Sequence, residues 1–228
     1  AMNFIRQLEE RIDTSVVQEI AFLENHPHTI TQQAKRLIEQ GCDHVIVVPV
    51  LLFAAKHALM DIPKEMKTVQ DQYPQVHIQQ TETFGSKAGS RAVLLDRFLQ
   101  AKKEAAGRPL TGVLLAHGTK MTQEPQQTLT LIAEQIQEVA GFPIAALSLK
   151  GEGDYTFEIG KLLQQQKQVV IVPFFLFEGH LIHLLKAHLS EVFPEERFVI
   201  TPTLEFDSRI IDDLESIVKE ALYVSDHG

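Results

Sequence analysis

The sequence has a single cysteine, Cys42, and no tryptophan among its 228 residues. One cysteine excludes an intramolecular disulfide and a zinc site built from several thiolates, and this usage predicts a protein of the reducing cytoplasm. The apolar runs at 45–55 and 169–177 are shorter than the ~20 residues that a membrane helix needs, and each contains a proline, so no span is expected. Basic residues are also few: Lys and Arg number 21 against 30 Asp and Glu, a net charge of −9. This balance argues against a nucleic-acid-binding surface.

Apolar runs and amphipathic segments alternate along the chain. The run at 44–53 is rich in β-branched residues, which is typical of a strand buried on both faces. The segment 29–41 carries Ile30, Ala34, Leu37 and Ile38 on one helical face, and Gly41 follows it as a C-terminal cap. The segment 61–74 is expected to begin with Asp61 as its N-cap and a proline in its first turn. The expected strands cover 16–24, 44–53, 76–85, 111–118, 143–149, 169–177 and 198–204, and the expected helices cover 3–13, 29–41, 61–74, 90–106, 124–141, 156–166, 180–193 and 207–222. Such alternation predicts an α/β protein with parallel sheets covered by helices on both faces.

The chain repeats one plan twice. When VIVVPVLLFA is set over VVIVPFFLFE, Pro49 aligns with Pro173, an offset of 124 residues (173 − 49 = 124). A repeat of this size indicates a duplicated domain, and the break at 107–109 predicts two lobes, residues 1–107 and 108–228, each a doubly wound, flavodoxin-like parallel sheet with a cleft between them. The second half opens on a strand ending in Ala116-His117-Gly118, whereas the first half opens on a helix. A first strand and its loop are therefore expected to be missing from the N-terminal half as given.

Several of the ten histidines fall where parallel strands end. Glu24 ends the second expected strand, His57 follows the third, and His117 ends the first strand of the second half. His180 and His183 follow the copy of the third strand, with a spacing that places both rings on one helix face. Imidazole and carboxylate groups gathered at the rim of a sheet can bind a divalent metal or exchange protons near neutral pH. A lone histidine after a strand is more often packed or capping than functional, but the repeat of His57 at His180 favours function.

The motifs around these residues resemble one known family. PVLLFAAKHALMDIP resembles the P-L-L-x-x-A-x-H-x-x-x-D-I-P signature of class II tetrapyrrole chelatases, the sirohydrochlorin cobalt- and ferrochelatases of the CbiX/SirB type. AFLENHPHTI is similar to their F-L-E segment, and LLAHGT to their H-G-[ST] loop. The resemblance covers nearly the whole chain and includes the duplicated architecture. It implies a lyase of siroheme or cobalamin biosynthesis that inserts Fe²⁺ or Co²⁺ into sirohydrochlorin or a related metal-free tetrapyrrole.

The same resemblance implies the roles of individual residues. His57, His117 and Glu24 are the expected catalytic residues. The expected metal ligands are His57, Glu24, His117, His180, His183 and Glu152, although the offset of 124 residues places Ser148, and not Glu152, opposite Glu24. Lys56 and Met60 are expected to contact the substrate. The histidine of the first H-G loop has no counterpart in the N-terminal half, so two half-complete sites compete.

The expected partners are the tetrapyrrole and the metal, which is a substrate, with no tightly bound cofactor, no nucleic acid and no membrane. Because the two lobes supply an internal pseudo-symmetry, a monomer is expected. Two other functions stay open at this point. One is a non-catalytic carrier of metal or tetrapyrrole; the other is a histidine phosphatase that uses His117, although Ala116 stands where that class has an arginine.

Overall fold

The computed structural model describes residues 2–12, 15–151, 153–165 and 168–227. The chain forms two compact units, residues 1–85 together with 210–228, and residues 86–209. All strand pairs in the described ranges are parallel, which confirms the predicted α/β fold with parallel sheets. None of the described helices is both long and apolar enough to cross a bilayer.

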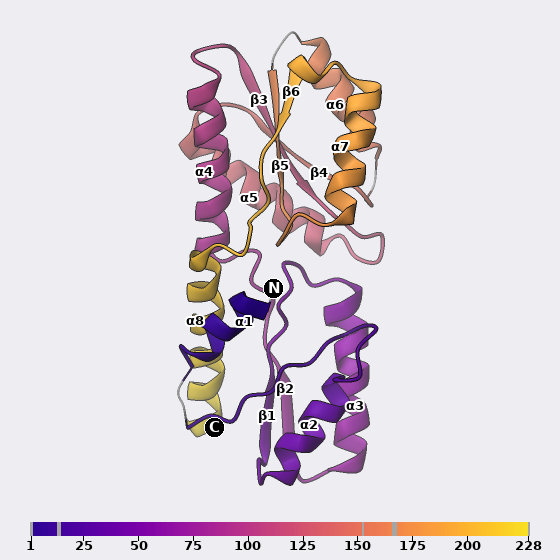
Figure 1. The fold of residues 1–228 in the computed structure, drawn as a ribbon, viewed down its shortest axis with the longest axis vertical. Helices are drawn as coiled ribbons and strands as arrows, with labels where there is room; N and C mark the ends of the chain where they lie inside the picture. Colours follow the sequence, from indigo (N-terminus) through magenta and orange to yellow (C-terminus); the bar gives the residue numbers. More distant parts are fainter. Residues whose placement is uncertain (1, 13–14, 152, 166–167, 228) are drawn as a thin grey trace. The chain divides into compact units, whose positions relative to one another are not determined.

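The second unit contains a four-stranded parallel sheet in the order β4-β3-β5-β6 (Figure 1). Its strands are β3 (Leu110–Ala116), β4 (Ile144–Ser148), β5 (Gln168–Pro173) and β6 (Phe198–Ile200). The strand that comes first in the chain is thus central, between the second and the third, which is the order of flavodoxin-like sheets. β3 is buried along its whole length, as a continuous apolar strand with a neighbour on each side should be.

Helices cover this sheet. They are α4 (Ala88–Glu104), α5 (Glu124–Ala140), α6 (Tyr155–Gln164) and α7 (His180–Val192). Ile159 of α6 and Ile182 of α7 pack with Val113 and Ile171 in one buried cluster, and Figure 1 shows α4 on the side of the sheet away from α6 and α7. Phe98 of α4 packs over β3, since a Cβ placed on Gly112 would lie 2.7 Å from its ring.

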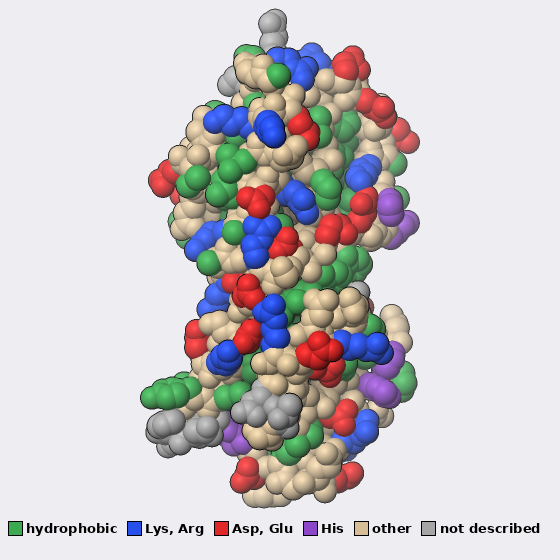
Figure 2. All heavy atoms as spheres, turned by 60° about the vertical axis from the view of Figure 1, so that its left-hand side comes forward, with side chains coloured by type: hydrophobic (Ala, Val, Ile, Leu, Met, Phe, Trp, Pro, Cys, Tyr) green, Lys and Arg blue, Asp and Glu red, His purple; other side chains and the backbone are tan. Residues whose placement is uncertain are grey.

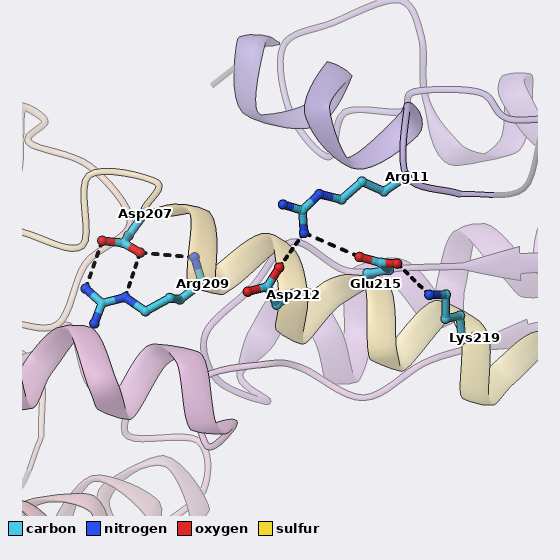
Figure 3. A network of polar contacts seen from close by, with 6 residues as sticks. All are labelled: Arg11, Asp207, Arg209, Asp212, Glu215 and Lys219. Carbon is cyan, nitrogen blue, oxygen red and sulfur yellow. Dashed lines mark hydrogen bonds and ion pairs between the residues drawn. The ribbon is translucent and has the colours of Figure 1, made fainter.

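The first unit is built around a two-stranded parallel sheet, β1 (His44–Val47) and β2 (His77–Gln80). Its helices are α1 (Met2–Glu9), α2 (Ile30–Glu39), α3 (Ile62–Gln72) and, from Ile210 on, α8 (Ser208–His227). Thr29 caps α2 by accepting a hydrogen bond from the Gln32 backbone. Figure 3 shows the guanidinium of Arg11 beside α8, where it pairs with Asp212 and, at 3.4 Å, with Glu215.

The compact units do not follow the predicted division after residue 107. α4 precedes that break but packs with the residues after it, and α8 lies in the second half of the sequence but groups with residues 1–85. The two sequence repeats therefore exchange their last helices. The division at 107 stays a prediction about the repeat in the sequence.

The prediction of a strand at 16–24 is wrong, because these residues are irregular in the structure. Their counterpart in the repeat is β4, which pairs with β3, whereas the described residues of the first unit hold no strand equivalent to β3. The backbone carbonyl of Ile20 instead accepts a hydrogen bond of 3.0 Å from the buried side chain of Gln33. A strand needs a neighbour for its backbone groups, and apolar composition alone does not supply one.

The same lack of a neighbour shortens β1, which ends at Val47 although the apolar run continues to Phe53. Its counterpart β5 extends to Pro173 because β3 pairs with it as far as that residue. A cavity of about 290 Å³ lies between residues 19–23 and β1, lined by apolar side chains that include Phe22, Ile30 and Val45. In the repeat, residues 16–24 correspond to β4 and β1 corresponds to β5. The position between β4 and β5 is occupied by β3 in the second unit.

Candidate metal and proton-transfer site

His57 begins a single π-helical turn, His57–Asp61, that leads into α3. The turn closes with a hydrogen bond from the Ile62 backbone N–H to the His57 carbonyl. Its inner side is fixed, because Ala58 and Ile62 are buried and the Gln80 side chain donates to the Ala58 carbonyl at 3.1 Å. Isolated π-helical turns are rare and occur often at functional sites.

The ring of His57 lies between two carboxylates. Its Nδ1 is 2.8 Å from Asp61 Oδ2, and its Nε2 is 4.0 Å from Glu24 Oε1. The His57 side chain is 38% exposed and that of Glu24 is 64% exposed, so the pair is open to solvent and is not sealed in the core. The structure thus brings together His57 and Glu24, two residues that the sequence placed at the ends of different strands.

The distance between His57 Nε2 and Glu24 Oε1 matters for metal binding. A first-row dication such as Zn²⁺ lies about 2.0–2.2 Å from an imidazole nitrogen or a carboxylate oxygen, so one ion can contact both atoms across 4.0 Å. No group of three or more His, Cys, Asp or Glu side chains suited to a metal ion occurs in the described ranges. His57 and Glu24 supply two exposed donor groups, which suit an open site that receives and releases a metal.

Lys56 and Met60 lie beside His57 and point to solvent. Met60 is 54% exposed, so this large apolar side chain is accessible at the surface. The Lys56 ammonium is 3.6 Å from Asp61 Oδ2, so this cation has a carboxylate partner within the protein. On the face shown in Figure 2, Lys and Arg side chains are interspersed with Asp and Glu.

In the second unit His117 follows β3 and is exposed. Its Nδ1 is 2.9 Å from the Gly118 carbonyl, and its own carbonyl accepts a hydrogen bond of 2.7 Å from the Lys150 backbone. Gly118 has a φ of +72°, and a Cβ there would lie 2.5 Å from the Lys150 carbonyl. Glycine is therefore required for the tight turn that exposes the ring.

The remaining predicted ligands of the second unit are not gathered around His117 by any described contact. His180 is the first residue of α7, and His183 lies one turn further on; both side chains are exposed. The hydrogen bond from Lys186, together with a smaller effect of His183, holds the pKa of Glu178 below its ordinary value. Glu152 lies outside the described residues, and Ser148 donates a hydrogen bond of 2.6 Å to Gln126.

Asp61 is the residue of this site whose role the sequence did not predict. It was expected to cap α3, but its side chain makes no capping hydrogen bond and contacts His57. The available signal was the spacing of four residues between His57 and Asp61, which puts both side chains on one helical face.

The two units, each with a parallel sheet, and the exposed histidine–carboxylate pair agree with the fold and site expected of a chelatase. The family model described as CbiX matches residues 1–101 and 111–221. The chain therefore belongs to the CbiX family, and the predicted resemblance is confirmed. Neither the fold nor the family supports the histidine-phosphatase interpretation of His117.

Similar proteins have names consistent with this family. The sirohydrochlorin ferrochelatase of Priestia megaterium is 27% identical over 226 residues, covering 97% of this chain and 84% of the relative. A sirohydrochlorin cobaltochelatase of the same organism is 27% identical over 193 residues, covering 82% and 63%. The solved structure of SirB from Bacillus subtilis with Fe³⁺ superposes with a TM-score of 0.84 at 25% identity, covering 99% of this chain and 90% of that one.

Proposed function

We propose that this chain is a sirohydrochlorin chelatase that inserts Fe²⁺ or Co²⁺ into the metal-free macrocycle, with His57 and Glu24 as the residues that handle metal and protons. Membership of the CbiX family and the names of the relatives support the reaction. The observation that carries the assignment of residues is the 4.0 Å separation of His57 Nε2 from Glu24 Oε1 on an exposed turn.

The proposed chemistry follows from the two side chains. Insertion replaces two pyrrole N–H protons by a dication, so it needs a base near the ring nitrogens and a ligand that gives up the metal. The lone pair on His57 Nε2 serves either purpose. Glu24 shares the metal as it arrives and, being mostly exposed, passes protons to solvent. Nitrogen and oxygen ligands suit labile Fe²⁺ or Co²⁺ better than thiolates.

Residues near this pair complete the proposed substrate contacts. Met60 offers an exposed apolar side chain to the face of the macrocycle, and Lys56 offers a cation to its carboxylates. In the second unit, His117 follows β3, the first strand of that unit. His180 and His183 are proposed only as secondary metal contacts. No tightly bound cofactor is part of this proposal, and a cytoplasmic monomer is the form in which we expect it to act.

The test is anaerobic incubation of sirohydrochlorin with Fe²⁺ and, separately, with Co²⁺, while the absorption spectrum of the macrocycle is followed. Protein is expected to accelerate the spectral change, and the ratio of the two rates gives the metal preference. His57→Ala should abolish the acceleration, His117→Ala should lower it less, and His77→Gln, a change at an exposed histidine of β2, should leave it intact.

The same assay separates a catalyst from a carrier. A carrier binds the metal or the macrocycle in a fixed stoichiometry without increasing the insertion rate. Stoichiometric binding with no acceleration by the folded protein would contradict the proposal and favour the carrier function.

A further inference from the structure

Asp61 lies beside the proposed site but has no role in the chemistry described above. Its Oδ2 is 2.8 Å from His57 Nδ1, while the other ring nitrogen, Nε2, faces Glu24. Asp61 therefore lies on the side of the ring away from the nitrogen that would bind metal. Its carboxylate acts on the imidazole and not on the ion.

The backbone holds this contact in place. Ala58 and Ile62, which are 4% and 2% exposed, anchor the π-helical turn on its buried side, and the hydrogen bond from Gln80 ties the Ala58 carbonyl to β2. His57 and Asp61 are four residues apart within this turn, so their side chains emerge on the same outer face. The Lys56 ammonium, 3.6 Å from the same Oδ2, adds a second contact to the carboxylate, although an ion pair this exposed contributes little to stability.

The contact determines which ring nitrogen carries the proton. An ionised carboxylate only accepts hydrogen bonds, so the neutral imidazole must donate from Nδ1 and keep its lone pair on Nε2. Nε2 is the nitrogen that faces Glu24. In metal sites generally, a carboxylate behind a ligating histidine fixes the tautomer and raises the basicity of the ring, and its loss lowers metal affinity by about 10–100-fold.

We infer that Asp61 is a positioning residue that holds His57 in the Nδ1–H tautomer, with Nε2 directed at the incoming metal or at the pyrrole proton. The inference rests on the proposed function for its benefit to catalysis, but the tautomer is a property of the protein alone. The motif spacing H-x-x-x-D is explained in the same way, because it provides a histidine and its orienting carboxylate from one turn.

The first experiment measures the tautomer without metal or tetrapyrrole. Nitrogen NMR of isotope-labelled histidine in the full chain, at alkaline pH, should show His57 protonated at Nδ1. Asp61→Ala should move it toward the Nε2–H form. Asp61→Asn should largely keep the Nδ1–H form, because the amide oxygen still accepts the hydrogen bond. An unchanged tautomer in a folded Asp61→Ala variant would overturn the inference.

The second experiment measures Co²⁺ binding to the same proteins by calorimetry. Asp61→Ala is expected to weaken binding about 10–100-fold, and Asp61→Asn is expected to weaken it less. The matched control is Asp71→Asn, on the exposed face of α3, where the carboxylate pairs with Lys67 at 2.8 Å; it should change neither the tautomer nor the affinity. Equal affinity of wild type and Asp61→Ala would overturn the link to metal binding. Failure of the wild type to insert metal, with the tautomer shift present, would instead count against the proposed function alone.

Discussion

Gly112→Ala is the sharpest test of how α4 packs on β3 within the second unit. A Cβ at this position of β3 would lie 2.7 Å from Phe98 Cε1 and 2.8 Å from Ile144 Cγ1. Both neighbours are core side chains, since Phe98 is fully buried and Ile144 is 8% exposed, so neither can move freely away. Overpacking of this kind costs about 1–3 kcal/mol, while replacing glycine restricts the unfolded chain and returns about 0.4–1 kcal/mol.

The net expectation is a loss of about 1–2 kcal/mol in the free energy of unfolding of the second unit. Hydrogen exchange of the β3 amides reports on that unit directly, and protection of Val113 and Leu115 should fall by about 10-fold, since 1.4 kcal/mol is a factor of ten in an equilibrium constant. Gly160→Ala is the matched control, because its Cβ would lie 3.5 Å from Phe193, an ordinary contact in the middle of α6, so this variant should be neutral or more stable.

A second change checks that Phe98 is the cause. Phe98→Leu shortens the side chain that the new methyl group meets, so Gly112→Ala should cost much less in the Phe98→Leu background than in the wild type. A coupling energy of roughly 1 kcal/mol is expected for residues in direct contact. A neutral Gly112→Ala, or strictly additive effects in the double variant, would refute the packing of α4 over β3.

Three further predictions concern the site and the ion pairs. His57→Ala and Glu24→Gln should each weaken Co²⁺ binding, and the double variant should be only slightly weaker than His57→Ala, because both side chains act on one ion; additive losses in calorimetry would contradict a shared ion. The hydrogen bonds from Arg209 (Figure 3) hold the pKa of Asp207 below its ordinary value of 3.8. The pair therefore stabilises the fold above pH 3.8, and this contribution is lost as the pH falls from 3.8 through the lower pKa of the folded state. Arg209→Gln should make acid unfolding, followed by circular dichroism, less steep between these two pH values. Arg11→Met should shift the urea midpoint of the first unit only slightly, because Arg11 and Asp212 are both exposed and exposed ion pairs contribute little to stability; a large shift would mean that Arg11 contributes through more than its charge.

The strands that the sequence predicted correctly each pair with a neighbouring strand in the structure. β3 is buried along its whole length and β5 from Val169 on, and each has a parallel neighbour on both sides. Residues 16–24 are also rich in apolar residues but have no adjacent strand in the described part of the first unit, and they are irregular. Residue pattern reports how well a segment suits a sheet, and it does not report whether the neighbouring strand is present.

The site was predictable to the extent that it depends on sheet topology. Parallel strands place their carboxyl ends at one edge of a sheet, so the sequence predicted that Glu24 and His57 lie at the same edge. Glu24 lies 4.0 Å from His57 even though residues 16–24 form no strand. The π-helical turn was not predictable from residue pattern, since α- and π-helical turns place residues four apart on nearly the same face.

This difference in the turn changes the meaning of Asp61. At the N-cap of an ordinary helix, the carboxylate of an aspartate accepts hydrogen bonds from free backbone N–H groups, which is the role that the sequence predicted for Asp61. The π-helical turn runs without interruption into α3, so those N–H groups already have carbonyl partners, such as the His57 carbonyl for Ile62. The carboxylate is then free to accept from His57 Nδ1. A local change from cap to continuous helix thus converts a structural residue into one that sets the orientation of the proposed metal ligand.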